Sequence, residues 1–298
     1  MTPGIHLLHK PAGPTSFSVV QSCIEQTKPA PSGKKPKICH GGTLDPFAQG
    51  LLLILVEPAT RLFDCLHDIP KTYEAVIRWG VETDNGDPLG KVVATADSSS
   101  LTVAQLEEAL APFAGWHEQI PPATSAKRID GERAYEKVQR GETVVMPPCR
   151  VYLHEARWIE HHLPGESRLR ITVKGGFYVR ALARDLGRNL GCGAHLAELR
   201  RLSIGPYNDP GPGRSIALSG RDILPWLRTR ILEDSDIGEL RKGESIRLGH
   251  MLPPEWAIPA GFPLPAPHVR GFHGDRFCFL LIPQDGRLRM VSPLRGGL

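Results

Sequence analysis

The sequence lacks several motifs by which common enzymes and metal proteins are recognised. Its six cysteines form no CxxC pair, which argues against a zinc ribbon or a thioredoxin-like site and fits reduced thiols. No HExxH, GxSxG or GxGxxG motif occurs, so zinc-protease, common serine-hydrolase and dinucleotide-binding signatures are missing. The segment GDPLGKVV resembles a phosphate loop, but its glycine spacing is one residue short and no Ser or Thr follows Lys91. We therefore expect no bound metal.

Long apolar runs are also absent. None reaches the roughly 18 residues that a membrane span requires, and the first residues show no basic region followed by a long apolar segment. We expect a cytoplasmic protein that does not contact a membrane. The chain has 298 residues, of which 41% are hydrophobic, enough for one large domain and a smaller one.

Charge is uneven along the chain although its net value is only +4. Residues 1–40 contain five lysines and one acidic residue, and residues 168–201 contain eight basic residues and two acidic ones. Such local excess suits a polyanion such as RNA. Charge alone leaves open the alternative that these are solvated faces of ordinary helices.

Local patterns predict a chain that mixes strands and helices. We expect strands at residues 5–8, 51–56 and 71–83, a hairpin through DNGDPLGK into VVAT, and a strand over 168–180 that leads into a helix over 181–191. Ser16 is the expected cap of a helix, and Thr102 with Gln105 forms a capping box for another. The segment TKPAPSGKKPK is predicted to be a loop.

The sequence divides into two expected domains. Residues 1–212 form the first, within which the polar, proline-bounded segment 119–150 is an excursion from the main body. After the linker-like DPGPGRS, residues 213–298 are rich in proline and contain short strand candidates such as RFCFLLI and RLRMVS. We expect this second domain to be small and β-rich.

Asp45 draws attention because it precedes a strand that is apolar throughout. An aspartate is ionised at neutral pH and can act as a nucleophile without a general base. Gly41 and Gly42 before it permit tight backbone geometry, and Pro46 after it fixes the chain. The alternative is that Asp45 only caps the turn or a helix that begins at Pro46.

Five blocks of the sequence, in order, resemble the motifs of TruB-type tRNA pseudouridine synthases. They are KPAGPTS, HGGTLDPFAQGLL with ATRLF, KTYEAVIRWGVETDNGDPLG, QIPPATSAKRIDGERAYEKVQRG and GGFYVRALARDLGRNLGCGAHLAELRRLSIGPY. The resemblance covers roughly residues 5–207. It implies an α+β pseudouridine synthase fold around a long mixed, largely antiparallel sheet, with residues 119–150 as a thumb-like RNA-binding insertion.

The implied activity is conversion of the uridine at position 55 in the T loop of tRNA to pseudouridine. This reaction flips the base out of the loop and uses no metal or other cofactor. The resemblance implies tRNA as the partner, and we expect a monomer. It leaves open whether the carboxylate attacks C1′ of the ribose, attacks C6 of the ring, or removes a ribose proton.

The resemblance also assigns roles to individual residues. Asp45 matches the catalytic aspartate, Tyr73 the tyrosine that stacks on the flipped base and receives the C5 proton, and Arg180 the arginine that keeps the aspartate ionised. Tyr178, expected on the same strand face as Arg180, and Leu199 would line the pocket. The matched positions near the RNA are Lys10, on the backbone, His40, and the insertion bases Lys127, Arg128, Arg133, Lys137 and Arg140.

Two parts of the chain depart from the family pattern. The lysine-rich insertion at residues 27–37 lengthens the link before His40, and the part after residue 212 resembles at most a reduced or divergent PUA domain. One rival function is a tRNA-binding folding factor without catalysis, which has no need of Asp45, Tyr73 and Arg180 together. Another is an aspartate-dependent glycoside hydrolase, for which a second carboxylate near the first is expected.

Overall fold

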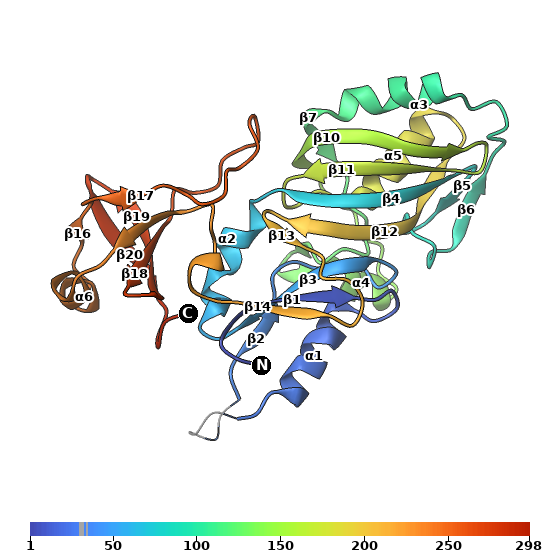
Figure 1. Cartoon of the computed structure of the whole chain (residues 1–298). Helices are drawn as coiled ribbons and strands as arrows, with labels where there is room; N and C mark the ends of the chain where they lie inside the picture. Colours follow the sequence, from blue (N-terminus) through green and yellow to red (C-terminus); the bar gives the residue numbers. More distant parts are fainter. Residues whose placement is uncertain (30–32, 34) are drawn as a thin grey trace.

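The computed structural model describes residues 1–29, 33 and 35–298; the expected loop at residues 27–37 therefore lies partly outside the described residues. In the described chain, the main sheet has ten strands in the order β14-β1-β3-β12-β4-β11-β10-β7, with β2 on β3 and β13 on β12 (Figure 1). Its strands are β1 (Gly4–Lys10), β2 (Ile38–His40), β3 (Gln49–Val56), β4 (Lys71–Trp79), β7 (Gly115–Gln119), β10 (Cys149–His162), β11 (Glu166–Val173), β12 (Ala194–Ile204), β13 (Tyr207–Asn208) and β14 (Ser215–Leu218). Only β12 and β3 pair in parallel among these described strands, which confirms the mixed, largely antiparallel sheet.

Strand β3 is the buried strand predicted from its apolar run. Residues 51–56 are all fully buried. Leu51, Leu53 and Leu55 pack into one hydrophobic cluster, while Leu52 and Ile54 pack into another on the opposite face of the sheet. Full burial of each such side chain contributes about 1.5–3 kcal/mol relative to exposure. The strand is therefore a rigid base for the loop that precedes it.

Helices cover the sheet. They are α1 (Ser16–Gln26), α2 (Phe63–His67) after the 3₁₀ turn η1 (Ala59–Leu62), α3 (Val103–Leu110) followed by η2 (Ala111–Phe113), α4 (Ala134–Gln139), α5 (Val179–Asn189) and α6 (Asp234–Arg241), with η3 (Gly220–Asp222). The capping box of Thr102 and Gln105 is confirmed. Helix α5 buries Leu182 and Leu186 in one cluster with Ala75 and Ile77 of β4.

The cap of α1 differs from the prediction. Thr15, not Ser16, is the N-cap residue, and its side chain accepts a hydrogen bond from the Ser18 amide. Ser16 is buried instead; its hydroxyl donates to the Leu44 carbonyl at 2.9 Å and accepts from the Leu44 amide at 2.8 Å. The start of α1 thus holds the residue next to Asp45.

Two hairpins project from the sheet. One, β5 (Val81–Thr83) with β6 (Val92–Thr95), confirms the predicted hairpin. The predicted single strand over residues 71–83 is wrong, because the chain breaks at Gly80, which has φ +82°, into β4 and β5 of different sheets. The other hairpin, β8 (Arg128–Ile129) with β9 (Glu132–Arg133), lies within the excursion at residues 119–150 and is followed by α4. Among the described residues, no helix is long and apolar enough to cross a membrane.

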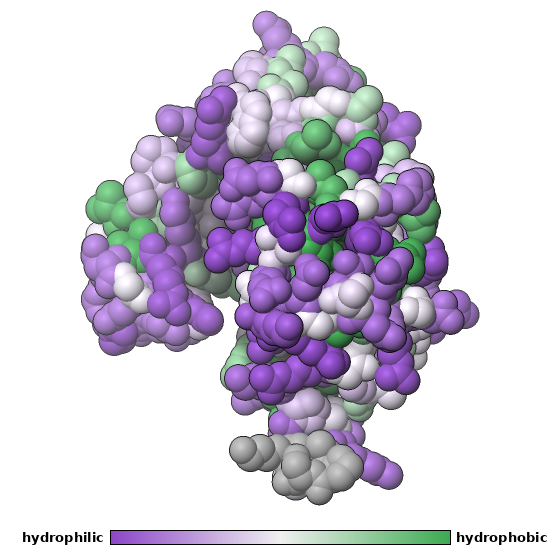
Figure 2. Space-filling view, turned by 90° about the vertical axis from the view of Figure 1, so that its left-hand side faces the viewer, coloured by the Kyte–Doolittle hydropathy of each residue, from purple (hydrophilic) through white to green (hydrophobic). Residues whose placement is uncertain are grey.

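The C-terminal part is a β-rich unit, as expected. Its six described strands have the order β16-β20-β19-β18-β15-β17, and they are β15 (Arg228–Ile231), β16 (Ile246–Arg247), β17 (Met251–Leu252), β18 (Val269–His273), β19 (Arg276–Gln284) and β20 (Arg287–Pro293). Figure 2 shows the face of the molecule that lies at the left of Figure 1, where the C-terminal unit is; hydrophilic residues cover most of this face. The boundary near residue 212 remains a prediction; β14, which follows it, pairs with β1 of the main sheet.

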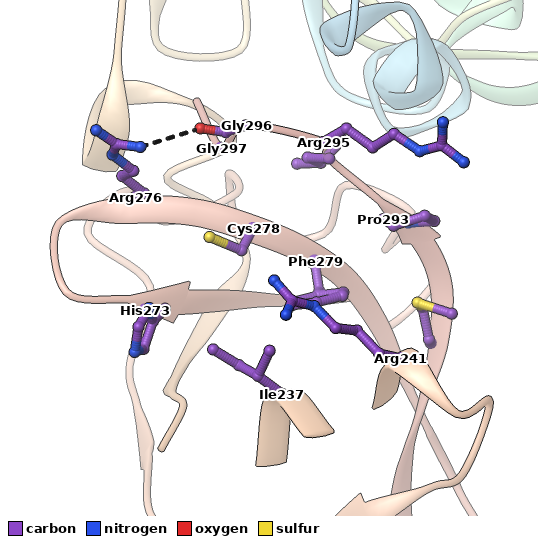
Figure 3. A pocket seen from close by; sticks show the side chains of 12 residues that line it. Ile237, Arg241, His273, Arg276, Cys278, Phe279, Pro293, Arg295, Gly296 and Gly297 are labelled. Carbon is purple, nitrogen blue, oxygen red and sulfur yellow. Dashed lines mark hydrogen bonds between the residues drawn. The ribbon is translucent and has the colours of Figure 1, made fainter. Parts of the chain in front are cut away.

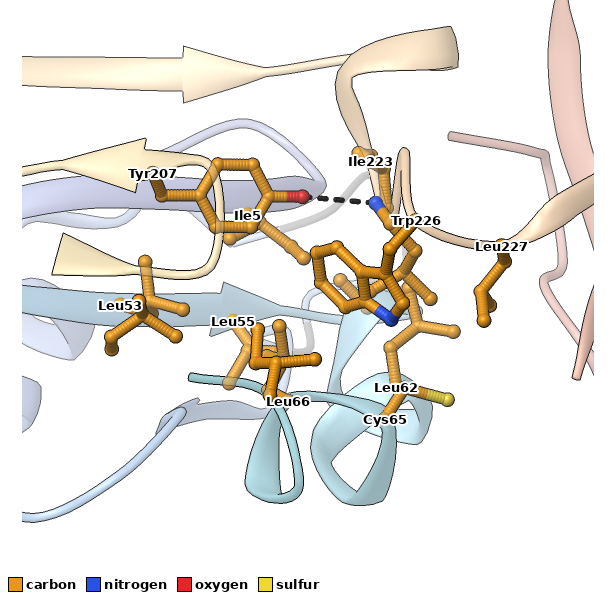
Figure 4. Packing of buried hydrophobic residues seen from close by; sticks show 14 of the residues in the cluster. Ile5, Leu53, Leu55, Leu62, Cys65, Leu66, Tyr207, Ile223, Trp226 and Leu227 are labelled. Atoms are coloured by element: carbon orange, nitrogen blue, oxygen red, sulfur yellow. Dashed lines mark hydrogen bonds between the residues drawn. The ribbon is translucent and has the colours of Figure 1, made fainter. Parts of the chain in front are cut away.

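A shared hydrophobic core joins the two parts. Phe272 and Phe277 of the C-terminal strands belong to the same buried cluster as Leu55 of β3. Trp226 belongs to the same cluster, and its ring packs against that of Tyr207 with centroids 5.8 Å apart (Figure 4). The Tyr207 hydroxyl accepts a hydrogen bond from the Leu224 amide at 2.9 Å. The C-terminal strands therefore pack directly on the elements that carry the β3 side of the sheet.

Candidate active site

Hydrogen bonds to its backbone carbonyls fix the loop that carries Asp45. Arg201 of β12, which is 1% exposed, donates to the carbonyls of Gly42, Thr43 and Leu51 at 3.0, 3.2 and 2.7 Å. The carbonyl of Asp45 accepts from the Ala48 amide at 3.1 Å, which closes a turn rather than a helix. The alternative that Asp45 caps a helix beginning at Pro46 is therefore wrong.

The side chain of Asp45 forms an ion pair with Arg180. Its Oδ1 lies 3.0 Å from Nη2 of the guanidinium. Nη1 of the same guanidinium lies 3.4 Å from Oδ2 of Asp87, whose side chain is as buried as that of Arg180. Arg180 also donates to the Thr124 hydroxyl at 2.8 Å and to the Asn85 carbonyl at 3.0 Å. One buried arginine thus bridges two carboxylates, so its orientation is fixed at both ends.

This setting has opposing effects on the Asp45 carboxyl. Burial raises its pKa, the Arg180 guanidinium lowers it, and the nearby Asp87 carboxylate raises it; the net direction is upward. Arg180 therefore counteracts a protonation that the dry surroundings favour. The proximity of Asp87 also supplies the second carboxylate that the glycoside hydrolase rival required, but Asp87 does not line the cavity described next.

A cavity of about 420 Å³ opens beside Asp45. Tyr73 reaches it from β4, and Leu199, which is 5% exposed, reaches it from β12. Tyr178 and Arg180 line it from the start of α5. Burial raises the pKa of Tyr178 above its ordinary value, so this phenol stays neutral at physiological pH. The structure thus brings together all five residues that the resemblance placed in the pocket.

The predicted strand over residues 168–180 is too long. Strand β11 ends at Val173, and Tyr178 is the N-cap residue of α5, which contains Arg180. The chain turns at Gly175 and Gly176; the latter has φ +89°. Gln119 holds the Tyr178 backbone by accepting from its amide at 3.0 Å and donating to its carbonyl at 3.3 Å. The prediction that Tyr178 and Arg180 share one face of a strand is therefore wrong, although both side chains line the cavity.

The prediction that Lys10 contacts the RNA backbone is wrong. Lys10 is fully buried, and its ammonium donates to the carbonyls of Pro11, Pro46 and Ala48 at 2.9, 3.2 and 2.7 Å. These three bonds use its three donors, so it is neither a solvated lysine nor placed to bind an RNA phosphate. Burial lowers its pKa to about 8, while Asp45 raises it and Arg201 lowers it. Lys10 holds the chain on the C-terminal side of Asp45.

His40 lies on β2 and does not line the cavity. Its Nδ1 accepts a hydrogen bond from the Gly42 amide at 3.4 Å. Burial lowers its pKa, with Arg201 and Arg133 acting in the same direction. These effects favour the neutral form of the His40 imidazole.

The basic residues of the 119–150 insertion differ in their surroundings. Lys127 lines the cavity. The guanidinium of Arg128 donates to the Gly131 carbonyl at 3.1 Å, and that of Arg133 lies 5.9 Å from the Tyr135 ring centroid. Arg140 forms ion pairs with two glutamates of the insertion, and Lys137 with Asp130.

Three buried charges of the site were not identified from sequence. Arg201 and Asp87 are described above, and Lys71 at the start of β4 is the third. Its ammonium donates to the carbonyls of Leu66, His67 and Ile69 at 3.1, 2.6 and 3.3 Å. Burial lowers the pKa of Lys71 to about 7. Each of the three lies within a sequence block that resembles the TruB motifs, so the resemblance could have pointed to them. From the charge pattern alone, such residues are expected to be solvated.

A larger cavity, of about 550 Å³, lies in the C-terminal unit (Figure 3). Arg241, Arg276 and Arg295 surround an apolar floor that includes Phe279. No carboxylate lines it, so it lacks the group on which the chemistry of the Asp45 cavity depends.

The fold has counterparts among solved structures. The chain superposes on a protein of a solved Cbf5–Nop10–Gar1 complex with a TM-score of 0.68 at 20% identity, covering 98% of this chain and 84% of that one. A solved H/ACA RNP bound to a substrate RNA containing 2′-deoxyuridine gives a TM-score of 0.66 at 18% identity, with 98% and 84% covered. The chain therefore has the same fold as these two proteins.

Sequence comparison identifies the family of the chain. Residues 31–179 match the N-terminal domain of TruB family pseudouridylate synthases, and residues 180–213 match a tRNA pseudouridylate synthase B C-terminal domain. Over 223 residues the chain is 40% identical to tRNA pseudouridine synthase B of Aromatoleum aromaticum, covering 74% of this chain and 68% of that one. It is 42% identical over 257 residues to the Parasynechococcus marenigrum protein of that name, with 82% and 85% covered. The chain belongs to the TruB family, and it is a pseudouridine synthase, an isomerase.

Proposed function

We propose that this enzyme converts the uridine at position 55 in the T loop of tRNA to pseudouridine, with Asp45 as the catalytic group. The observation that carries the proposal is the Asp45–Arg180 ion pair, 3.0 Å long, beside a cavity that Tyr73, Tyr178 and Leu199 also line. The relatives named tRNA pseudouridine synthase B support tRNA as the substrate.

The reaction rearranges bonds within one nucleotide. The bond between C1′ and N1 breaks, the base turns, a bond forms between C1′ and C5, and the proton lost from C5 is balanced by one gained at N1. Asp45 acts on the ribose or the ring in each of the three routes that the resemblance leaves open, and attack as a nucleophile requires its ionised form. Tyr73 is proposed to stack on the base and to receive the C5 proton.

Arg180 has two roles in this proposal. Its charge opposes the upward pKa shift that burial causes in Asp45, and its second carboxylate partner, Asp87, keeps the guanidinium from turning away. Arg201 and Lys10 hold the backbone on the two sides of Asp45. The carboxylate is thus oriented before the substrate arrives, which is how a fixed site lowers a barrier.

The target base must leave the stacked loop to reach Asp45, at a cost of a few kcal/mol. Contacts between the protein and the RNA backbone must offset this cost. Lys127 lines the cavity, and we propose that it, Arg128 and Arg133 bind phosphates around the flipped nucleotide. A pure folding factor would need these contacts but not the ion pair of Asp45.

The test is to incubate the purified chain with a tRNA transcript and to map pseudouridine at single-nucleotide resolution. The proposal expects conversion at position 55 and no conversion in a transcript with cytidine at that position. Binding without any conversion would favour the folding-factor alternative. Conversion at another position would overturn the assignment of the target nucleotide.

A further inference from the structure

The cavity beside Asp45 has a second wall, which none of the proposed catalytic residues forms. Phe63 and His67 of α2 line it, together with Lys174 and Phe177 from the turn between β11 and α5. Because Phe63 and His67 are four residues apart on a helical turn, their side chains share one face. This wall is built from residues on which the chemistry at Asp45 does not depend.

Phe63 has the properties of a contact residue rather than of a core residue. Its side chain is 38% exposed, and in the described part of the chain it belongs to none of the hydrophobic clusters. An aromatic ring at the wall of this cavity offers a flat apolar surface. Nucleobases stack on such rings whatever their identity, because every base has a π-face.

The surroundings of Phe63 are rigid. Gly175 passes so close to the end of α2 that a Cβ atom there would lie 2.1 Å from the His67 carbonyl oxygen. The Lys174 amide donates to the Tyr152 carbonyl at 3.0 Å, and the Lys174 ammonium forms an ion pair with Asp68. Helix α2 and the turn are therefore held together before any RNA binds.

The wall also carries positive charge next to the ring. The side chain of Lys174 is 17% exposed, and its ammonium pairs with Asp68, the C-cap residue of α2. The imidazole of His67, which is 54% exposed, pairs through Nδ1 with Asp68 at 3.0 Å. A flat apolar ring beside an ammonium suits a base that is linked to a phosphate.

We propose that Phe63 and Lys174 form a second nucleotide subsite, which holds the nucleotide adjoining the extruded uridine. The base of that nucleotide stacks on Phe63, and the phosphate that links it to the target lies near Lys174. The inference rests on the proposed function, since it takes RNA as the substrate. A single free uridine has no neighbouring nucleotide and could not make this contact.

The experiment compares wild type with Phe63→Ala on T stem-loop RNAs under single-turnover conditions. Three RNAs are used: an intact one, one without the base 5′ to the target and one without the base 3′ to it. We expect Phe63→Ala to weaken binding of the intact RNA about 10-fold with little change in the rate at saturating enzyme. With one of the two abasic RNAs, wild type and variant should bind equally.

If Phe63→Ala has the same effect on all three RNAs, or no effect on any, the subsite is wrong. Phe63→Trp should keep the affinity of wild type, and Ile159→Ala, a matched change at a 41% exposed apolar residue of β10, should leave all three RNAs unaffected. Lys174→Gln should lower the slope of log affinity against log salt by about 0.7; an unchanged slope overturns the phosphate contact. An inactive wild type would instead refute the proposed function.

Discussion

Replacing Arg180 tests the electrostatics of the site most sharply. Arg180→Met removes the charge 3.0 Å from Asp45 but keeps a side chain of similar length. An opposite charge at this distance lowers an aspartate pKa by roughly 1–3 units, and burial and Asp87, which both raise the pKa of Asp45, then act unopposed. Because the proposed reaction uses the ionised carboxylate, we expect activity to be lost as the pH falls through this pKa.

We therefore expect the acidic limb of the pH profile to move upward by roughly 1–3 pH units in Arg180→Met. The assay is single-turnover conversion of a T stem-loop RNA at saturating enzyme, from pH 5 to pH 9. Arg180→Lys keeps the charge but cannot bridge both carboxylates as the fork does, so its limb should move less. A profile that keeps its position while the rate falls at every pH would refute the reasoning.

The same substitution leaves Asp87 buried without its partner. Breaking a buried ion pair in this way typically costs about 3–5 kcal/mol of stability. The double variant Arg180→Met with Asp87→Asn should recover part of this stability while its pH profile remains shifted. Thermal unfolding of the single and double variants separates the loss of folding from the loss of ionised Asp45.

Two further predictions concern RNA binding and pH-dependent stability. Changing Lys127 and Arg128 together to Gln should weaken tRNA binding and lower the salt slope by about 1–2; equal slopes for wild type and variant, measured by filter binding, would exclude both from phosphate contact. Burial lowers the pKa of Lys71 to about 7, so above this pH the unfolded chain holds a proton that the folded chain lacks, and the free energy of unfolding should rise from pH 7 to pH 10. Denaturant titrations of Lys71→Met should show a smaller rise in the free energy of unfolding over this pH range. Some rise should remain, because the lowered pKa of Lys10 contributes in the same direction. A rise equal to that of wild type would mean that Lys71 does not titrate in this range.

Elements with a strong local signal could be predicted from sequence. The apolar run at residues 51–56 gave a buried strand, and the capping box at Thr102 gave the start of α3. The end of β11 was misplaced because the apolar pattern continues through Phe177 and Tyr178, whereas the two glycines at 175 and 176 turn the chain. Tight packing of Gly175 against α2 decides this, and a local pattern does not contain that contact.

Asp45 stands out in the sequence because a carboxylate is unusual before a strand that is apolar throughout, and the structure places it beside a cavity; its catalytic role stays a prediction. The buried cations were not predictable. Lys10 and Arg201 look like solvated surface charges in the sequence, but both donate to backbone carbonyls of the Asp45 loop from strands distant in the chain. The partnership of Asp87 with Arg180 likewise joins residues 93 positions apart. The pairing of β1, β3 and β12 sets the contacts of Lys10 and Arg201. The contact of Asp87 joins the turn between β5 and β6 to helix α5. Neither depends on neighbours in sequence.

The account depends most directly on the carboxylate of Asp45, and Asp45→Asn tests it with the smallest change in shape. Pseudouridine formation is measured in a T-loop transcript at saturating enzyme, beside the affinity of the variant for the same RNA. We expect conversion to be abolished while binding stays within several-fold of wild type. Conversion at the normal rate by Asp45→Asn would contradict the central claim.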